Sequence, residues 1–413
     1  MNADRVLEDL RELARLTGGP DGARRVCWTD EWARAREFLR SRLDELPVEV
    51  TVDAAGNLWA TMAGEEEGFV IVGSHVDSVP AGGWLDGALG VFTAVEALRT
   101  QAENGPPPVG LRLVDWADEE GARFGRSLFG SSCCAGTLEP DEVRDLRDRD
   151  GERLEDVVAR YDVDLDRARE SGAELSGARA YIEGHIEQGP VLESKGEPAA
   201  TVLGTFGVER HLAVFTGETA HAGATPMPMR HDTFMAAAQA ALAIREIGFR
   251  NDGVCTIGGA TSEPGVVTAV PGRTEMLLDQ RHLDPDALAA MLAEARAACE
   301  QAAADHGCEV ELQHLWSIPP IPFDERLIGF ARQAVQDAGG KDTAIPSGPL
   351  HDAAEMARLI PTVMIFSSSS PPVSHTKEED TPEDDLRVAI EAYGRTVEAA
   401  LASAAAGELP PRA

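Results

Sequence analysis

Apolar and polar positions alternate with two different periods in the first half of the chain. Short apolar runs at 48–53, 57–64, 69–75 and 110–116 predict strands, and the segment 90–101 has the apolar spacing of a helix. Strands that alternate with helices in this way are typical of βαβ units, which build a largely parallel sheet. The pattern therefore predicts an α/β domain.

The order of predicted strands and helices changes after Gly207, where the pattern predicts an inserted domain. The expected elements, in chain order, are a strand at 210–218, a helix at 229–249, strands at 254–260 and 274–283, a helix at 285–307 and a strand at 308–316. This β-α-β-β-α-β order is that of a split βαβ, ferredoxin-like sandwich, which can fold as a compact unit. Three prolines between Ile318 and Phe323 predict a stiff crossing back into the first domain.

After this crossing the first domain resumes. The pattern predicts a helix at 324–340, a strand at 361–368 and a last helix from about Pro382. We therefore expect one domain formed by 1–209 and 325–413, with the inserted domain at 210–324.

The composition agrees with two globular domains. A chain of 413 residues is long enough for two hydrophobic cores, and 43% hydrophobic with 5% aromatic residues is typical of an α/β protein. No stretch approaches the roughly 20 uninterrupted apolar residues of a membrane helix. The N-terminal segment has the spacing of an amphipathic helix, with Val6, Leu10 and Leu13 on one side, and lacks the apolar centre of a signal peptide. We expect a cytoplasmic protein with no membrane partner.

Charge and motifs exclude several functional classes. A formal net charge of −34 argues against a nucleic-acid partner, because phosphate binding needs basic patches. The six cysteines are scattered and form no pair of CxxC motifs, so neither a disulfide framework nor a thiolate zinc site is indicated. The chain also lacks a GxSxG nucleophile elbow and a GxxxxGK[ST] phosphate loop.

The most informative stretch is FVIVGSHVDSVPAGGWLDGALGV, residues 69–91. Its apolar strand delivers His75 at the carboxyl end, where α/β folds place their ligands. Asp77 follows two residues later and is positioned to orient the imidazole, as the partners of metal-binding histidines do. Asp86 follows a glycine-rich turn and opens a helix, so its carboxylate can project into the same space.

Three further clusters supply the other chemical groups. Glu119 and Glu120 follow the strand at 110–116, and adjacent residues on an irregular backbone point to different sides. One can bind a metal while the other exchanges protons with a water. His185 lies in the segment 178–193, and His375 follows a strand and a serine-rich loop. Three histidines, an aspartate and a glutamate, with a spare glutamate, match a pair of zinc-like ions that share a bridging carboxylate.

These clusters, in this order, resemble the M20 metallopeptidase superfamily. The strings GSHVDSVPAGGWLDGALGV, DEEGARFG, HIEQGP and HAGATPM resemble its amidase branch, which comprises N-carbamoyl-L-amino acid hydrolases, β-ureidopropionases and allantoate amidohydrolases. The resemblance extends from about residue 50 to 385. It implies a mixed-sheet α/β catalytic domain with two metal ions, and an inserted ferredoxin-like α+β domain that acts as a lid and forms a homodimer.

The resemblance also implies roles for individual residues. His75, Asp86 and His185 would bind one divalent ion, and Asp86, Glu120 and His375 the other; zinc is expected, although manganese, cobalt or nickel suit the same ligands. Glu119 would be the general base, and Asp77 the partner of His75. His221 of HAGATPM would stabilise the oxyanion, Arg281 would bind the substrate carboxylate, and Gln188 would contact the ureido or amide group.

Several positions depart from the family pattern, among them Thr268 and the loop that carries His351. Thr268 stands where the family usually has an asparagine, and the family's GAGHD appears as GPLHD, which changes the backbone beside His351. The metal-binding residues are intact while the expected substrate contacts are altered. This contrast predicts retained hydrolysis of a shifted small-molecule substrate that carries a carboxylate.

The main hypothesis is hydrolysis of the C–N bond of an N-carbamoyl or related N-acyl L-amino acid, by a metal-activated water with Glu119 as base. An allantoate-type amidohydrolase and an M20 dipeptidase or deacylase are alternatives within the superfamily. A catalytically silent metal-binding relative is the alternative from another class.

Overall fold

The computed structural model describes residues 1–412 and divides into two compact units. Unit 1 comprises Met1–Gly204 and Phe323–Ala413, and unit 2 comprises Thr205–Pro322. The sequence pattern predicted the boundaries between the two domains at 209/210 and 324/325. The difference at the first crossing has a simple cause: strand β8 (Ala199–Thr205) and strand β9 (Gly207–Thr216) are separated by one residue, so no turn signal marks the boundary.

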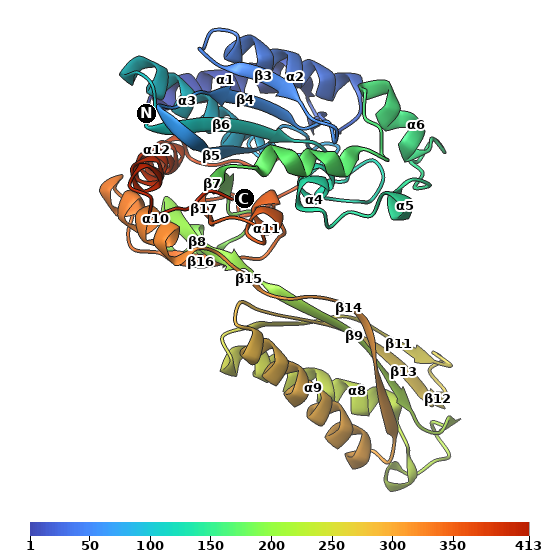
Figure 1. Ribbon diagram of the computed structural model, residues 1–413. Coiled ribbons are helices and arrows are strands. Elements are labelled where there is room, and N and C mark those ends of the chain that lie inside the picture. Colours follow the sequence, from blue (N-terminus) through green and yellow to red (C-terminus); the bar gives the residue numbers. More distant parts are fainter. Residues whose placement is uncertain (413) are drawn as a thin grey trace. The chain divides into compact units, whose positions relative to one another are not determined.

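Unit 1 is built on a large mixed sheet (Figure 1). The strands along it are, in order, β15 (Ile321–Pro322), β8, β17 (Thr362–Ser367), β7 (Ala178–Ile186), β5 (Glu66–His75), β6 (Val109–Trp116), β4 (Leu58–Met62) and β3 (Glu49–Val52), with β16 (Ala344–Ser347) paired to β8. The four central strands β17, β7, β5 and β6 are parallel, whereas β3, β4 and β8 pair antiparallel. The prediction of a mixed-sheet α/β fold is confirmed.

Side chains of each central strand alternate between two cores. On β5, Val70 and Val72 belong to one core, and Ile71 belongs to the other. The larger core is covered by the helices α1 (Ala3–Thr17), α2 (Asp30–Leu43), α3 (Ala88–Asn104), α10 (Glu325–Asp337) and α12 (Glu383–Ala405). The smaller one includes residues of α11 (Asp352–Met356). Both faces of the sheet are therefore buried, as a parallel centre requires.

The charged segment after residue 140 forms only short helices. They are α5 (Pro140–Val143), α6 (Leu154–Val158) and the 3₁₀ turns η1 (Ala159–Tyr161) and η2 (Ala168–Leu175), and two further short helices of unit 1 are α4 (Phe129–Ala135) and α7 (Val191–Lys195). Val157 and Val158 pack into the larger core. The apolar residues of this stretch therefore anchor it to the domain.

Unit 2 has a four-stranded antiparallel sheet with two helices on one face (Figure 1). Its elements are β9, β10 (Ala220–His221), η3 (Met227–Met229), α8 (Thr233–Arg250), β11 (Val254–Glu263), β12 (Ala269–Val270), β13 (Arg273–His282), α9 (Pro285–Asp305) and β14 (Glu309–Ile318). The strand order β11-β13-β9-β14 is that of the split βαβ arrangement. Small residues such as Ala240 and Ala295 fill the core where the helices meet the sheet.

Two small two-stranded ribbons complete the fold. In unit 1, β1 (Gly18–Gly19) pairs with β2 (Gly22–Ala23), and in unit 2, β10 pairs with β12. Among the described residues, the helices are all too short or too polar to span a bilayer.

Candidate metal centre

Neighbouring parallel strands bring the predicted ligands to one edge of the sheet of unit 1. His75 ends β5, His185 is the penultimate residue of β7, and the loop after β6 carries Glu119 and Glu120. His375 lies in the loop that follows β17. The carboxyl ends of parallel strands meet at the same edge, which is where α/β folds bind ligands. The topology therefore gathers residues that are up to 300 positions apart in the chain.

The side chains form two groups that share Asp86. The ligand atoms of His75, Asp86 and His185 lie within 4.8 Å of one another, and so do those of Asp86, Glu120 and His375. Asp86 turns Oδ1 to His185 Nε2 at 3.2 Å and Oδ2 to His375 Nε2 at 3.6 Å. Glu120 Oε2 lies 3.4 Å from the same nitrogen of His375. One carboxylate oxygen of Asp86 thus faces each group, as a bridging ligand would.

The donor atoms fit divalent cations. His75 Nδ1 lies 3.2 Å from the carbonyl oxygen of Asp77, and His185 Nδ1 lies 2.9 Å from that of Ile186. These contacts favour the proton on Nδ1 and leave the Nε2 lone pairs directed into the cluster, where neither Nε2 makes a hydrogen bond with the described residues. Neutral imidazoles with carboxylates are the ligands that zinc and similar ions accept.

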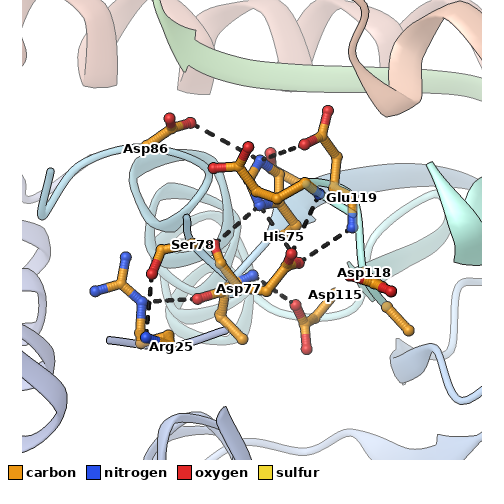
Figure 2. A network of polar contacts seen from close by, with 12 residues as sticks. Arg25, His75, Asp77, Ser78, Asp86, Asp115, Asp118 and Glu119 are labelled. Carbon is orange, nitrogen blue, oxygen red and sulfur yellow. Dashed lines mark hydrogen bonds and ion pairs between the residues drawn. The ribbon is translucent and has the colours of Figure 1, made fainter. Parts of the chain in front are cut away.

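Asp77 organises the base of the cluster (Figure 2). Its carboxylate accepts hydrogen bonds from the backbone N–H groups of Glu119 at 3.3 Å and Glu120 at 3.2 Å, and it lies 3.5 Å from His75 Nδ1. The two glutamates consequently point to different sides. Glu119 Oε2 lies 3.7 Å from His75 Nε2, whereas Glu120 reaches His375.

Burial and the neighbouring histidines act differently on the carboxyl groups of Asp86 and Glu119. Burial raises the pKa of Glu119 well above its usual range, although the positive charge of a protonated His75 would oppose this shift. Burial alone would also raise the pKa of Asp86, but its contacts with His185, His75 and His375 lower it below the ordinary value. Burial thus raises the pKa of Glu119, and that of Glu120 as well, whereas the histidines around Asp86 hold its pKa low.

A second buried layer lies behind His185. Glu183 accepts hydrogen bonds from Ser74 Oγ at 2.7 Å and from the N–H of Ala353 at 2.9 Å. His351 is buried, with its ring centroid 4.4 Å from that of His185, and burial lowers the pKa of His351 well below its usual range. Glu183 was not among the residues predicted from the sequence. Its place two residues before His185, on the same face of β7, is the signal that would have found it.

Gln188 lies at the metal cluster itself. Its Nε2 donates to Asp86 Oδ2 and to Ser374 Oγ, both at 3.0 Å, and its backbone has a positive φ of 58°. The predicted contact of Gln188 with the substrate stays a prediction. In this structure its amide holds the shared carboxylate.

The predicted residues of unit 2 lie at two ends of its sheet. His221 pairs with Ala269 in the ribbon β10-β12, and the carbonyl of Thr268 accepts a hydrogen bond from the N–H of Ala222. Arg281 lies opposite Val208, eight positions along β13 from the end at Arg273 that adjoins this ribbon. At about 3.4 Å per residue this separation is roughly 27 Å. The structure therefore groups Thr268 with His221 and places Arg281 apart.

Comparison with known proteins identifies the family. The model of peptidase family M20/M25/M40 matches residues 71–399. The chain belongs to this family. An N-carbamoyl-L-amino acid amidohydrolase of Geobacillus stearothermophilus is 34% identical over 96% of this chain and 98% of the relative. An allantoate amidohydrolase of Bacillus subtilis is 30% identical over 94% of this chain and 95% of the relative.

Solved structures agree with this assignment. A hydantoinase/carbamoylase family amidase from Burkholderia ambifaria superposes with a TM-score of 0.86 and 32% identity, over 97% of this chain and 98% of that one. The M20 chain is thus an amidohydrolase of a metal-dependent family, and it contains His, Asp and Glu groups that can bind metal.

Proposed function

We propose that this M20 enzyme hydrolyses the C–N bond of an N-carbamoyl or related N-acyl L-amino acid. The observation that carries the proposal is the pair of ligand groups sharing Asp86, with Glu119 beside them. The names of the amidohydrolase relatives support the substrate class. For a carbamoyl substrate, the products would be the amino acid, ammonia and carbon dioxide.

The metal centre would supply the reactive water. His75, Asp86 and His185 would hold one divalent ion and Asp86, Glu120 and His375 the other, with zinc, manganese, cobalt or nickel all chemically suited. Ions bound there would acidify a water and polarise the scissile carbonyl. Glu119 would take the proton from the attacking water and deliver it to the leaving nitrogen.

His221 is prepared to act as a hydrogen-bond donor. Its Nδ1 accepts hydrogen bonds from the backbone N–H groups of Gly223 and Ala224, each at 3.1 Å. This arrangement places the proton on Nε2, so an exposed N–H is available for the oxyanion that develops during attack. Arg281 would bind the substrate carboxylate through its planar guanidinium, which Asp279 holds by a hydrogen bond of 2.8 Å.

The separation of these two residues supports a homodimer. An amino-acid-sized substrate is much shorter than the roughly 27 Å from Arg281 to the end of β13 at Arg273, which adjoins the ribbon that carries His221. One chain therefore cannot supply both contacts to one substrate, and a second copy would supply the other. Unit 2 also has a surface suited to pairing: β11 is an edge strand, and Phe234, Leu242 and Phe249 are exposed on α8.

A second candidate is an allantoate-type activity. It is favoured by the similarity of the chain to allantoate amidohydrolases. Allantoate is itself a carboxylate with ureido groups, so the same metal chemistry would act on it.

A substrate panel tests the proposal. The metal-loaded enzyme is assayed with N-carbamoyl-L-amino acids, N-acetyl-L-amino acids, allantoate and dipeptides, and the released ammonia and amino acid are measured. We expect ammonia and free amino acid from the carbamoyl compounds at the highest kcat/KM. A higher kcat/KM on allantoate would select the second candidate, and cleavage of dipeptides without any ammonia release would overturn both.

A further inference from the structure

Arg25 is fully buried beside the metal centre and is attached to the residues that follow His75. Its Nε donates to the carbonyl oxygen of Val76 at 2.7 Å. Its backbone N–H donates to Ser78 Oγ at 3.1 Å, and its carbonyl accepts a hydrogen bond from the N–H of Ser78, also at 3.1 Å. Arg25 thus holds two residues of the segment between His75 and the loop that leads to Asp86.

The chain around Arg25 lies along that loop. The N–H of Ala23 donates to the carbonyl of Gly82 at 2.8 Å, and the N–H of Ala81 donates to the carbonyl of Ala23 at 3.0 Å. Gly22 has a φ of 107°, and a Cβ atom there would lie 2.5 Å from the carbonyl oxygen of Gly82, so only glycine permits this approach. Residues 22–25, which we call the N-terminal strap, therefore run along the ligand-bearing loop at backbone distance.

Val76 is held from its other side by a second buried charge, that of Asp115. Its N–H donates to Asp115 Oδ1 at 2.8 Å, and Arg36 Nε in turn donates to Asp115 Oδ2 at 2.7 Å. Both backbone polar groups of Val76 are thus bound by charged side chains. Because Val76 lies between His75 and Asp77, the same contacts fix the ligand and the carboxylate that orients Glu119 and Glu120.

The charge of Arg25 also faces the cluster. The acidic groups that act on its guanidinium include Asp86, Asp77, Glu379 and Glu120. Its Nη1 and Nη2 make no hydrogen bond with the described residues. A buried cation without a direct carboxylate partner is costly, and here the charge of Arg25 offsets that of the predicted ligands Asp86 and Glu120.

We propose that Arg25 is a positioning residue of the metal centre, which fixes His75, Asp77 and the loop to Asp86 through the backbone of Val76 and Ser78. The inference rests on the proposed metal-dependent function. Arg25 contacts neither the metal ligands' donor atoms nor the residues expected to bind substrate. Its replacement should therefore change metal affinity and kcat more than it changes KM.

The test measures metal dissociation constants of the full chain by competition with a chelator, using zinc alone, together with kcat and KM. Groups that orient metal ligands typically contribute 10–100-fold to metal affinity. Arg25→Met should therefore bind zinc about 10–100-fold more weakly and lower kcat, with KM changed less than about twofold. Arg25→Lys, which keeps the charge, should recover part of the lost affinity.

Two further variants keep the test decisive. Arg112→Met removes another buried arginine, whose Nη1 binds the carbonyl of Glu174 at 2.7 Å, and it should lower stability without changing zinc affinity. Ser78→Ala removes the acceptor of the Arg25 backbone N–H and leaves the guanidinium in place, so it tests the backbone contact separately; zinc should bind a few-fold more weakly, of the order expected for one hydrogen bond. If Arg25→Met does not fold, Arg25→Lys decides the matter, because it loses the geometry of the Nε contact with Val76 and should bind zinc more weakly than the wild type.

The outcomes separate this inference from the proposed function. If the wild type binds zinc and turns over while Arg25→Met and Ser78→Ala bind zinc as tightly, the positioning role is wrong and the proposed function stands. Equal losses of zinc affinity in Arg25→Met and Arg112→Met would also overturn the positioning role, because the loss would then reflect general stability. If the wild type neither binds metal nor needs it for turnover, both proposals fail.

Discussion

The metal cluster of unit 1 and the predicted substrate contacts of unit 2 are built in opposite ways. His75, Asp86 and His185 are buried, and hydrogen bonds with neighbouring residues hold their side chains in place. His221 and Thr268 are exposed on a two-stranded ribbon, far along the sheet from Arg281. On the proposed function, the difference teaches that the reactive groups would be preorganised within one chain, whereas substrate selection would need contacts from a second copy.

The largest expected effect is on the buried side of this comparison. Glu119→Gln should lower kcat by about 10³-fold, because it removes the proton acceptor while the ligand set is intact. Bound metal, measured by mass spectrometry, should be unchanged. Glu120→Gln is the matched contrast, since it alters a ligand and should lose metal as well as activity. Wild-type kcat in Glu119→Gln would remove this residue from the mechanism.

The exposed side is tested next by His221→Ala. Loss of one oxyanion donor typically costs 10²–10³-fold in kcat, and we expect a loss of about that size with metal content unchanged. Mixing His221→Ala with Glu119→Gln chains should restore activity, because a hybrid dimer would contain one site with both groups. If hybrid dimers are shown to form and remain inactive, His221 acts in the site of its own chain. The proposal that a second copy supplies His221 would then be wrong.

A smaller effect is expected at Arg281. Arg281→Lys keeps the charge but loses the planar pair of donors, so KM should rise about 10-fold with a smaller change in kcat. Steady-state kinetics on the best substrate of the panel measure both. A fall in kcat of about the same factor, with KM unchanged, would mean that Arg281 acts in the transition state and does not bind the carboxylate of the bound substrate.

The smallest effect concerns the support of Arg281. Burial alone would raise the pKa of Asp279, but hydrogen bonds from Arg281 and Arg210 lower it below its ordinary value. A lowered pKa contributes stability above the unfolded value of about 4, and this contribution is lost as the pH falls through the folded value. Asp279→Asn should therefore lower Tm at pH 7 by no more than about 2 °C, since the pair is partly exposed. The difference from wild type should shrink below about pH 4, as thermal scans across pH would show.

The order of strands and helices and the clusters at strand ends were predictable because each depends on local signals. An apolar run that ends in His75, or one followed by the acids after Trp116, indicates that these residues lie at the edge of a parallel sheet. Glu183 was missed although the two-residue period of β7 marks it. Arg25 carries no local signal: it follows another arginine in a polar stretch, and only the fold brings it to Val76. Long-range contacts of this kind, and the anchoring of 140–178 to the core, arise from packing that periodicity does not encode.

The central claim is that catalysis resides in a metal cluster assembled from one chain. The most direct test strips the enzyme with a chelator, returns zinc or manganese in measured equivalents, and follows ammonia release from an N-carbamoyl-L-amino acid. We predict no turnover in the stripped enzyme and recovery that saturates near two equivalents per chain. Undiminished turnover in an enzyme shown to be free of metal would contradict the account.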